Sequence, residues 1–173
     1  MDKEFLKNTI YKLFNCDSPT GYSTNVNNLL IDILKEIGYT ANLTNKGNVR
    51  LFVEGQNHEK RVATSAHVDT LGLMVRSING DGTLKVTNVG GPSIPTLDGE
   101  YCKIMTRQGK SYTGTILCSS SSVHVYEDAK SKSRDLDSML IRIDERVNSK
   151  DDVKKLGIDN GDYIFIDPKT TIT

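Results

Sequence analysis

The pattern of apolar residues changes abruptly near residue 70, and this change limits the chain to few architectures. Before it, apolar residues recur at helical spacing in two segments, and strand-like runs follow. After it, short strand-like runs are separated by Gly-rich turns at intervals of about 8–12 residues. The sequence therefore predicts a layered α/β unit followed by a small β-barrel or sandwich.

The first 69 residues begin with two amphipathic helices. Asp2 can cap the first helix, and the second begins near Ser23 or Thr24 and ends before Gly38, which suits the C′ position. Their apolar stripes are Phe5, Leu6, Ile10, Leu13 and Phe14 in the first helix, and Val26, Leu29, Leu30, Ile33, Leu34 and Ile37 in the second. Because each helix has one apolar face, each must pack against another part of the structure.

Three strand-like runs follow these helices. Residues 39–44 and 49–54 flank the turn Asn45-Lys46-Gly47-Asn48 and predict a hairpin. The third run, residues 61–68, is rich in small uncharged side chains, which is typical of a strand covered on both faces. An α/β sheet with such a strand needs neighbouring strands and helices on both of its sides.

The second part of the chain predicts short strands within residues 71–118, a further strand at 139–143 and another at 163–166. Between them, the polar residues 123–138 predict a surface loop. Ser149 and Gly157 delimit a short helix over residues 150–156. We expect three domains: residues 1–69 in the α/β unit, 70–162 in an inserted barrel, and 163–173 as a strand returning to the α/β unit.

Composition excludes several classes of function. The chain has 22 basic and 22 acidic residues and a pI near 6.8, so it lacks the charge of a nucleic-acid or anionic-membrane binder. Its apolar runs are shorter than the roughly 18 residues that a membrane-spanning helix needs. The cysteines, Cys16, Cys102 and Cys118, are odd in number and form no CxxC pair, which favours reduced thiols and a cytoplasmic location.

The main candidate for chemistry is the motif His67-Val68-Asp69. Residues two apart on an extended chain face the same way, so the imidazole and the carboxylate lie side by side. This pair suits Zn²⁺, Co²⁺ or Mn²⁺, and Asp69 can alternatively orient the imidazole without binding the metal. By itself the motif is a weak signal and is more typical of a structural histidine hydrogen-bonded at the end of a strand.

A longer set of motifs gives the pair a context. The set comprises Ser18-Pro19-Thr20-Gly21, Gly47-Asn48-Val49, Ala66-His67-Val68-Asp69, Leu71-Gly72-Leu73-Met74-Val75, Gly90-Gly91, Gly114-Thr115-Ile116, Leu156-Gly157-Ile158 and Gly161-Asp162. In this order, the set closely resembles the M42 metallo-aminopeptidases, a family of glutamyl and deblocking aminopeptidases in which some members carry the name endoglucanase. The resemblance runs the whole length of the chain. The chain is similar to the N-terminal half of a member.

The resemblance implies a partial α/β, zinc-peptidase-like catalytic domain that is interrupted by a small β-barrel used in dimerisation. It also implies a cytosolic hydrolase that removes N-terminal residues from peptides with two divalent metal ions, Zn or Co or Mn. His67 would bind one metal, and Asp69 would orient it. The other ligands and the general base lie in the family's C-terminal half. We therefore expect this chain alone to bind metal weakly, if at all, and to be inactive.

Other interpretations stay open. His58 lies in a polar turn and is typical of a solvated surface residue. His124 follows Ser119-Ser120-Ser121-Ser122, where family members commonly carry prolines, so a structural or surface use of His124 is favoured over a family role. Residues 70–162 can alternatively form a non-catalytic β-barrel module for binding or oligomerisation. A glycosidase lacks support, because no pair of carboxylates is placed for acid and base work on a sugar.

Overall fold

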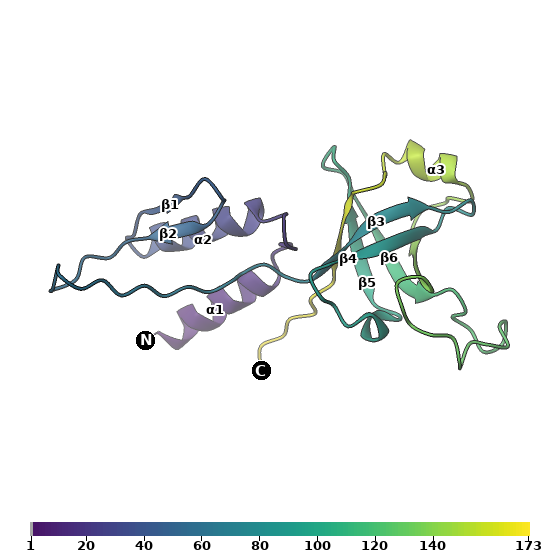
Figure 1. The fold of residues 1–173 in the computed structure, drawn as a ribbon, viewed down its shortest axis with the longest axis horizontal. Coiled ribbons are helices and arrows are strands. Elements are labelled where there is room, and N and C mark those ends of the chain that lie inside the picture. The colour runs from purple at the N-terminus through teal and green to yellow at the C-terminus, as the bar shows by residue number, and fades with distance from the viewer. Residues whose placement is uncertain (1) are drawn as a thin grey trace. The chain divides into compact units, whose positions relative to one another are not determined.

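The computed structural model describes residues 2–173 and divides them into two compact units. The first comprises the residues up to Thr70 together with Pro168–Thr173, and the second comprises Leu71–Asp167. Figure 1 shows helices and a small hairpin in the first unit and a β-barrel in the second. The predicted α/β class with a β-barrel is confirmed. Within residues 2–173, no helix is long and apolar enough to cross a membrane.

The first unit contains helix α1 (Lys3–Phe14), helix α2 (Thr24–Glu36) and a hairpin of strands β1 (Ala41–Leu43) and β2 (Val49–Leu51). The predicted cap of α1 forms, because the Asp2 carboxylate accepts hydrogen bonds from the first-turn backbone. After α2, Gly38 has φ +88°, the left-handed conformation that suits a helix-terminating glycine. The two predicted helices and the predicted hairpin are therefore confirmed.

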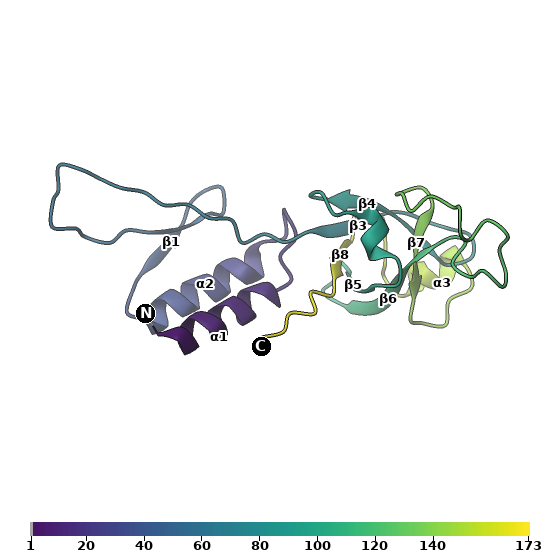
Figure 2. The same cartoon turned by 90° about the horizontal axis from the view of Figure 1, so that it is seen from below.

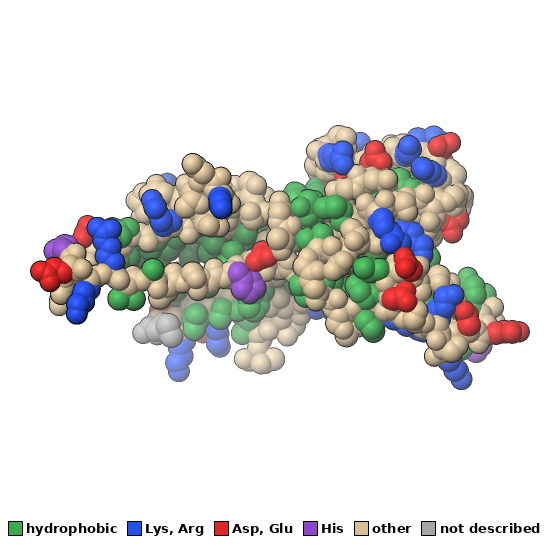
Figure 3. Space-filling view, in the orientation of Figure 1, with side chains coloured by type: hydrophobic (Ala, Val, Ile, Leu, Met, Phe, Trp, Pro, Cys, Tyr) green, Lys and Arg blue, Asp and Glu red, His purple; other side chains and the backbone are tan. Residues whose placement is uncertain are grey.

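Burial in this helical pair is incomplete. Helix α1 buries none of its residues, although its apolar stripe is present, and Phe14 is 59% exposed. Helix α2 buries Val26 and Ile33. Figure 3 shows hydrophobic side chains exposed along the helices. The amphipathic pattern thus marks an apolar face that the described residues only partly cover.

The predicted strand over residues 61–68 is wrong for this structure. Residues 52–69 form an extended connection without strand pairing, and Arg61 to His67 are all exposed. Figure 2 shows this long connection between β1–β2 and β3. A buried strand needs ladder partners on both edges, and the sheet of this unit consists of β1 and β2 alone among residues 2–173. The sequence pattern is that of a covered strand, but the covering elements are not among the described residues.

The second unit is a closed antiparallel barrel, the first of the two predicted alternatives. Its strands follow the order β3-β4-β7-β6-β5-β8 around the ring. Their bounds are β3 Gly72–Ile78, β4 Leu84–Val89, β5 Tyr101–Met105, β6 Ser111–Cys118, β7 Met139–Ile143 and β8 Tyr163–Ile166. A 3-10 helix (Ile94–Leu97) and helix α3 (Lys150–Lys155) complete the unit.

Strand β8 corrects the expected return strand. It pairs with β3 on one side and with β5 on the other, so it closes the barrel instead of entering the first unit. The physical reason is that β3 and β5 would otherwise be open edges, and closure supplies their backbone partners. Only Pro168–Thr173 returns to the first unit.

The barrel core follows from alternation along the strands. Leu73, Ile104, Ile116, Ile141 and Ile164 point inward and are at most 1% exposed. Gly114 is needed for close packing, because a Cβ atom there would lie 2.9 Å from the backbone oxygen of Arg142 on β7. The core of this unit is therefore contiguous and complete.

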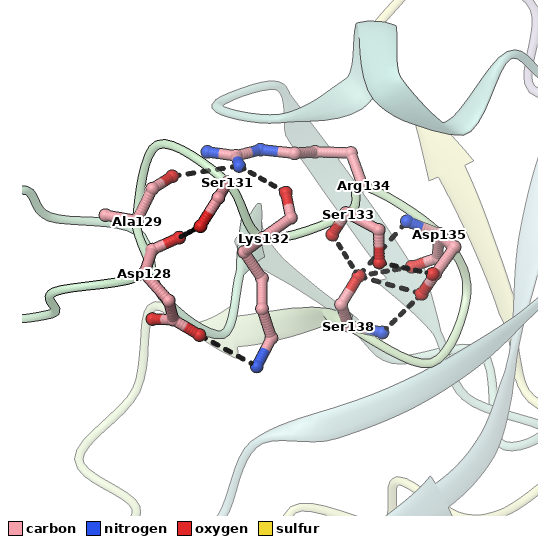
Figure 4. Close-up of polar contacts among 8 residues, drawn as sticks. All are labelled: Asp128, Ala129, Ser131, Lys132, Ser133, Arg134, Asp135 and Ser138. Atoms are coloured by element: carbon pink, nitrogen blue, oxygen red, sulfur yellow. Dashed lines mark hydrogen bonds and ion pairs between the residues drawn. The ribbon is translucent and has the colours of Figure 1, made fainter.

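The predicted surface loop between β6 and β7 is held by its own polar groups. The Arg134 guanidinium donates to the carbonyl oxygens of Ala129 and Lys132 and to the Asp98 carboxylate. The Asp135 carboxylate accepts from the Ser133 and Ser138 hydroxyls. Figure 4 shows the bonds of Arg134 to Ala129 and Lys132 and those among Ser133, Asp135 and Ser138, whereas Asp98 lies outside the loop. The network, together with the buried Ala129 and with Leu136, which packs against the barrel core, explains how a polar segment keeps a defined course.

Candidate functional site

The two predicted site residues lie side by side at the end of the extended connection. The His67 Nδ1 atom is 3.1 Å from the Asp69 Oδ1 atom. The His67 side chain is 86% exposed and that of Asp69 is 39% exposed. The i, i+2 spacing on an extended backbone brings the pair together even without a strand ladder. The imidazole is thus open to solvent and to incoming groups.

A loop between α1 and α2 contacts the residues on both sides of Asp69. The backbone N–H of Thr70 donates to the Ser18 carbonyl at 2.9 Å, and Pro19 forms a parallel bridge with Thr70. The Ser18 hydroxyl donates to the Val68 carbonyl at 3.2 Å, and Ser18 is fully buried. The backbone on either side of Asp69 is therefore fixed to this loop.

The same loop supplies a partner for the carboxylate. The Thr20 Oγ1 atom donates to Asp69 Oδ2 at 2.5 Å, while Oδ1 faces His67. The hydrogen bond from Thr20, followed by that from His67, lowers the pKa of Asp69 below its ordinary value, although burial opposes the shift. Asp69 is thereby held as a carboxylate with each oxygen engaged.

Sequence reasoning missed the role of Thr20. Ser18-Pro19-Thr20-Gly21 is only one of the motifs of the family resemblance, and nothing in its local pattern assigns a partner that lies 49 residues away. The only local signal is that two hydroxyl residues flank the proline of a Gly-containing turn, and such residues often bond to backbone groups.

The described residues do not assemble a complete metal site. Within residues 2–173, no group of three or more His, Cys, Asp or Glu side chains is placed to hold an ion. The chemistry of the pair nevertheless suits a metal, because a carboxylate on Nδ1 leaves the Nε2 atom of His67 available as a ligand. A catalytic zinc site takes three protein ligands. The pair therefore fits a metal as a partial ligand set.

The other two histidines have contacts of their own. His58 faces Glu54 at 3.6 Å, and both side chains are largely exposed, as the surface interpretation of His58 expects. His124 belongs to the second unit, where its backbone N–H donates to the Ser122 hydroxyl at 3.4 Å. Neither contact points to a ligand role.

The barrel unit contains a groove of about 670 Å³ at the turn between β3 and β4. It is lined by Asp81, Gly82, Thr83, Arg142, Ile143, Asp144, Glu145, Arg146 and Val147. Both acidic and basic side chains line this groove, and it includes neither His67 nor Asp69.

Known proteins resemble the chain in both sequence and structure. It is 42% identical to YhfE of Bacillus subtilis over 164 residues, which are 95% of this chain and 47% of YhfE. The solved aminopeptidase APDkam598 from Desulfurococcus kamchatkensis superposes with a TM-score of 0.80 at 27% identity, covering 95% of this chain and 43% of the other. The chain thus spans about half the length of the relatives that it matches.

A more distant structure shares the same fold. The TET1 peptidase of Pyrococcus horikoshii, described as assembling into a tetrahedron or a large octahedral shell, gives a TM-score of 0.75 at 21% identity. The match covers 93% of this chain and 46% of TET1. The sequence profile described as M42 glutamyl aminopeptidase matches residues 47–173, which include the His67–Asp69 pair and the whole barrel. The chain therefore belongs to the M42 glutamyl aminopeptidase family.

Proposed function

We propose that this chain is the N-terminal portion of an aminopeptidase that removes N-terminal residues from peptides at a two-metal centre. The observation that carries the proposal is the solvent-open His67–Asp69 pair, at 3.1 Å, in a chain of the M42 family. His67 is a metal ligand through Nε2, and Asp69 orients the imidazole. The remaining ligands and the general base come from a region outside these residues.

The metals of this site are Zn²⁺ or Co²⁺, with Mn²⁺ as a third candidate, because imidazole and carboxylate together suit all three. When bound, two such ions supply an activated water and polarise the scissile carbonyl. The contribution of this chain is to present the Nε2 atom with its tautomer set by Asp69. The chain holds this arrangement through the backbone contacts of Ser18.

The 173-residue chain alone is proposed to bind metal weakly and to be catalytically inactive, because the described residues offer at most two ligands. The test is to purify the chain with Zn²⁺ or Co²⁺, measure the metal retained after gel filtration, and assay hydrolysis of aminoacyl-p-nitroanilides. We expect substoichiometric metal and no turnover. His67→Ala should abolish residual binding, whereas His58→Ala, which removes another exposed imidazole of the same unit, should not. Stoichiometric metal with measurable turnover by the wild type contradicts the proposal.

Peptides are the proposed substrates, and the barrel is the proposed surface of a homo-oligomer. The support is the aminopeptidase name of the Desulfurococcus relative and the shell assembly of TET1. A cytoplasmic location is also proposed, because the three cysteines are odd in number, widely spaced and without a CxxC pair. Light scattering of the purified chain tests the assembly, and a monomer at high concentration counts against it.

One observation favours the second candidate, a non-catalytic binding or oligomerisation module. The barrel is closed, and its core is contiguous within Leu71–Asp167. A fragment restricted to this unit should then fold alone and retain any self-association of the full chain. Loss of self-association in a folded barrel fragment rules out the module.

A further inference from the structure

We propose that Thr20 is a positioning residue, whose hydroxyl holds the Asp69 carboxylate in the orientation that fixes the tautomer of His67. Thr20 lies in the loop between α1 and α2, and Asp69 follows the extended connection. The link to catalysis rests on the proposed function. The arrangement itself rests on contacts among residues of one unit.

The two carboxylate oxygens of Asp69 have different hydrogen-bond partners. Oδ2 accepts the Thr20 hydroxyl at 2.5 Å, and Oδ1 faces His67 Nδ1 at 3.1 Å. A carboxylate has no proton to donate, so the Nδ1 atom that faces it carries the hydrogen. The lone pair is then on Nε2, the atom that must bind a metal. Without Thr20, a surface carboxylate is free to rotate away from the imidazole, because both of these side chains are substantially exposed.

The loop holds the Thr20 hydroxyl in place because Ser18 of the loop is hydrogen-bonded to the residues on both sides of Asp69. Ser18 is fully buried and bonds to the carbonyl of Val68, and its own carbonyl accepts the N–H of Thr70. The Ser18 hydroxyl also lies 3.1 Å from the carbonyl of Cys16, within its own loop. Thr20 therefore reaches Asp69 from an ordered backbone, which limits the conformational entropy that its hydrogen bond costs.

Positioning of the Asp69 carboxylate by Thr20 can be distinguished from a purely structural role of Thr20 in attaching the loop. The contacts of Ser18 and Pro19 with residues 68–70 use backbone atoms and the Ser18 hydroxyl, and none of them uses the Thr20 side chain. Removing the Thr20 hydroxyl should therefore leave the loop attached and release only the carboxylate. A probe of the imidazole nitrogens separates the two roles.

The experiment uses the full ¹⁵N-labelled chain without metal, above the pH at which imidazole is charged. The two imidazole nitrogens of His67 are observed by long-range ¹H–¹⁵N NMR, with His67→Ala to assign them. In the wild type we expect the Nδ1–H tautomer to predominate. Thr20→Val should shift His67 toward the Nε2–H tautomer that a free histidine side chain favours in water. Thr20→Ser, which keeps the hydroxyl, should restore the wild-type tautomer.

Two controls sharpen the result. Thr44→Val is the matched control, because the Thr44 hydroxyl accepts the Asn48 N–H at 3.1 Å in the same unit, away from Asp69 in the hydrogen-bond network. It should leave the His67 nitrogens unchanged. In an Asp69→Ala background, Thr20→Val should have no further effect, since Thr20 acts only through Asp69.

Several outcomes overturn the proposal. They are a wild-type His67 with the tautomer ratio of a free histidine side chain, an unchanged tautomer in Thr20→Val, an equal shift in Thr44→Val, or an additive effect with Asp69→Ala. The readout needs no metal, so a failure of the proposed metal site leaves it interpretable. If the proposed function also holds, Thr20→Val should weaken Co²⁺ binding by less than about 10-fold. The effect is small because Thr20 bonds to Asp69, the partner of the ligand His67, and not to His67 itself.

Discussion

The barrel and the N-terminal unit differ in how completely they satisfy their own backbone and apolar surface. Each barrel strand has a neighbour on both sides, and its inward side chains are buried. In the N-terminal unit, the hairpin β1–β2 has open edges and α1 buries no residue. The same chain thus contains a barrel with a complete core and an N-terminal unit whose apolar helix faces are only partly buried. The difference shows that periodicity predicts which face needs burial and leaves open what buries it.

The largest expected effect contrasts the two units with one substitution. Ile104→Ala removes a fully buried barrel side chain and should lower the free energy of unfolding by about 2–5 kcal/mol. Ile10→Ala makes the same change at a site on α1 that is 38% exposed, and should cost less than about 0.5 kcal/mol. Urea unfolding of both variants measures the contrast. Equal losses would show that α1 is as well packed as the barrel.

A smaller effect is expected at Gly114. Gly114→Ala places a methyl group 2.9 Å from the Arg142 carbonyl oxygen and from an Ile141 methyl, so the paired strands must shift. We expect a loss of about 1–3 kcal/mol. Gly91→Ala is the matched control, because nothing lies within 4 Å of its added Cβ. The melting temperatures of the two variants give the comparison, and a neutral Gly114→Ala disproves the close approach.

The smallest expected effect is a change in pH dependence at Asp162, a buried barrel residue. Its Oδ2 accepts the Asp159 N–H, and its Oδ1 accepts no hydrogen bond from residues 2–173 and lies 3.8 Å from the Arg107 Nε. Burial raises the pKa of Asp162 above its ordinary value of 3.8, and Arg107 opposes the shift. A raised folded-state pKa contributes stability that is present below the unfolded pKa and is lost as pH rises through the folded one.

Asp162→Asn removes this titration. The stability of the wild type relative to the variant should therefore fall as pH rises from below 3.8 through the raised pKa, and then level off. Urea unfolding of both proteins across this range measures the difference. A relative stability that rises with pH would mean that Arg107 outweighs burial at this site.

These contrasts also explain which parts of the fold could be predicted from sequence. The helices, the hairpin and the barrel strands depend on local periodicity and turns, and their positions agree with the structure. Residues 61–68 have the pattern of a covered strand, yet a strand forms only with ladder partners, which the described residues do not provide. Residues 163–166 were expected in the wrong unit, because local pattern identifies a strand and not its neighbours.

Local sequence predicts the candidate site only in part, for the same reason. The approach of His67 to Asp69 could be predicted, because it depends on a spacing of two residues along an extended chain. The contact of Thr20 with Asp69 could not, because it joins residues 49 positions apart through a loop whose course depends on tertiary packing. The function of His67 as a ligand stays a prediction.

A cobalt titration of the 173-residue chain, followed through the NMR signals of its three histidines, tests the central claim most directly. Co²⁺ is paramagnetic and perturbs the ligand nearest to it. The account predicts that His67 responds at the lowest Co²⁺ concentration and that Asp69→Ala raises the concentration required. It is contradicted if His58, His67 and His124 respond together, as unrelated exposed imidazoles do.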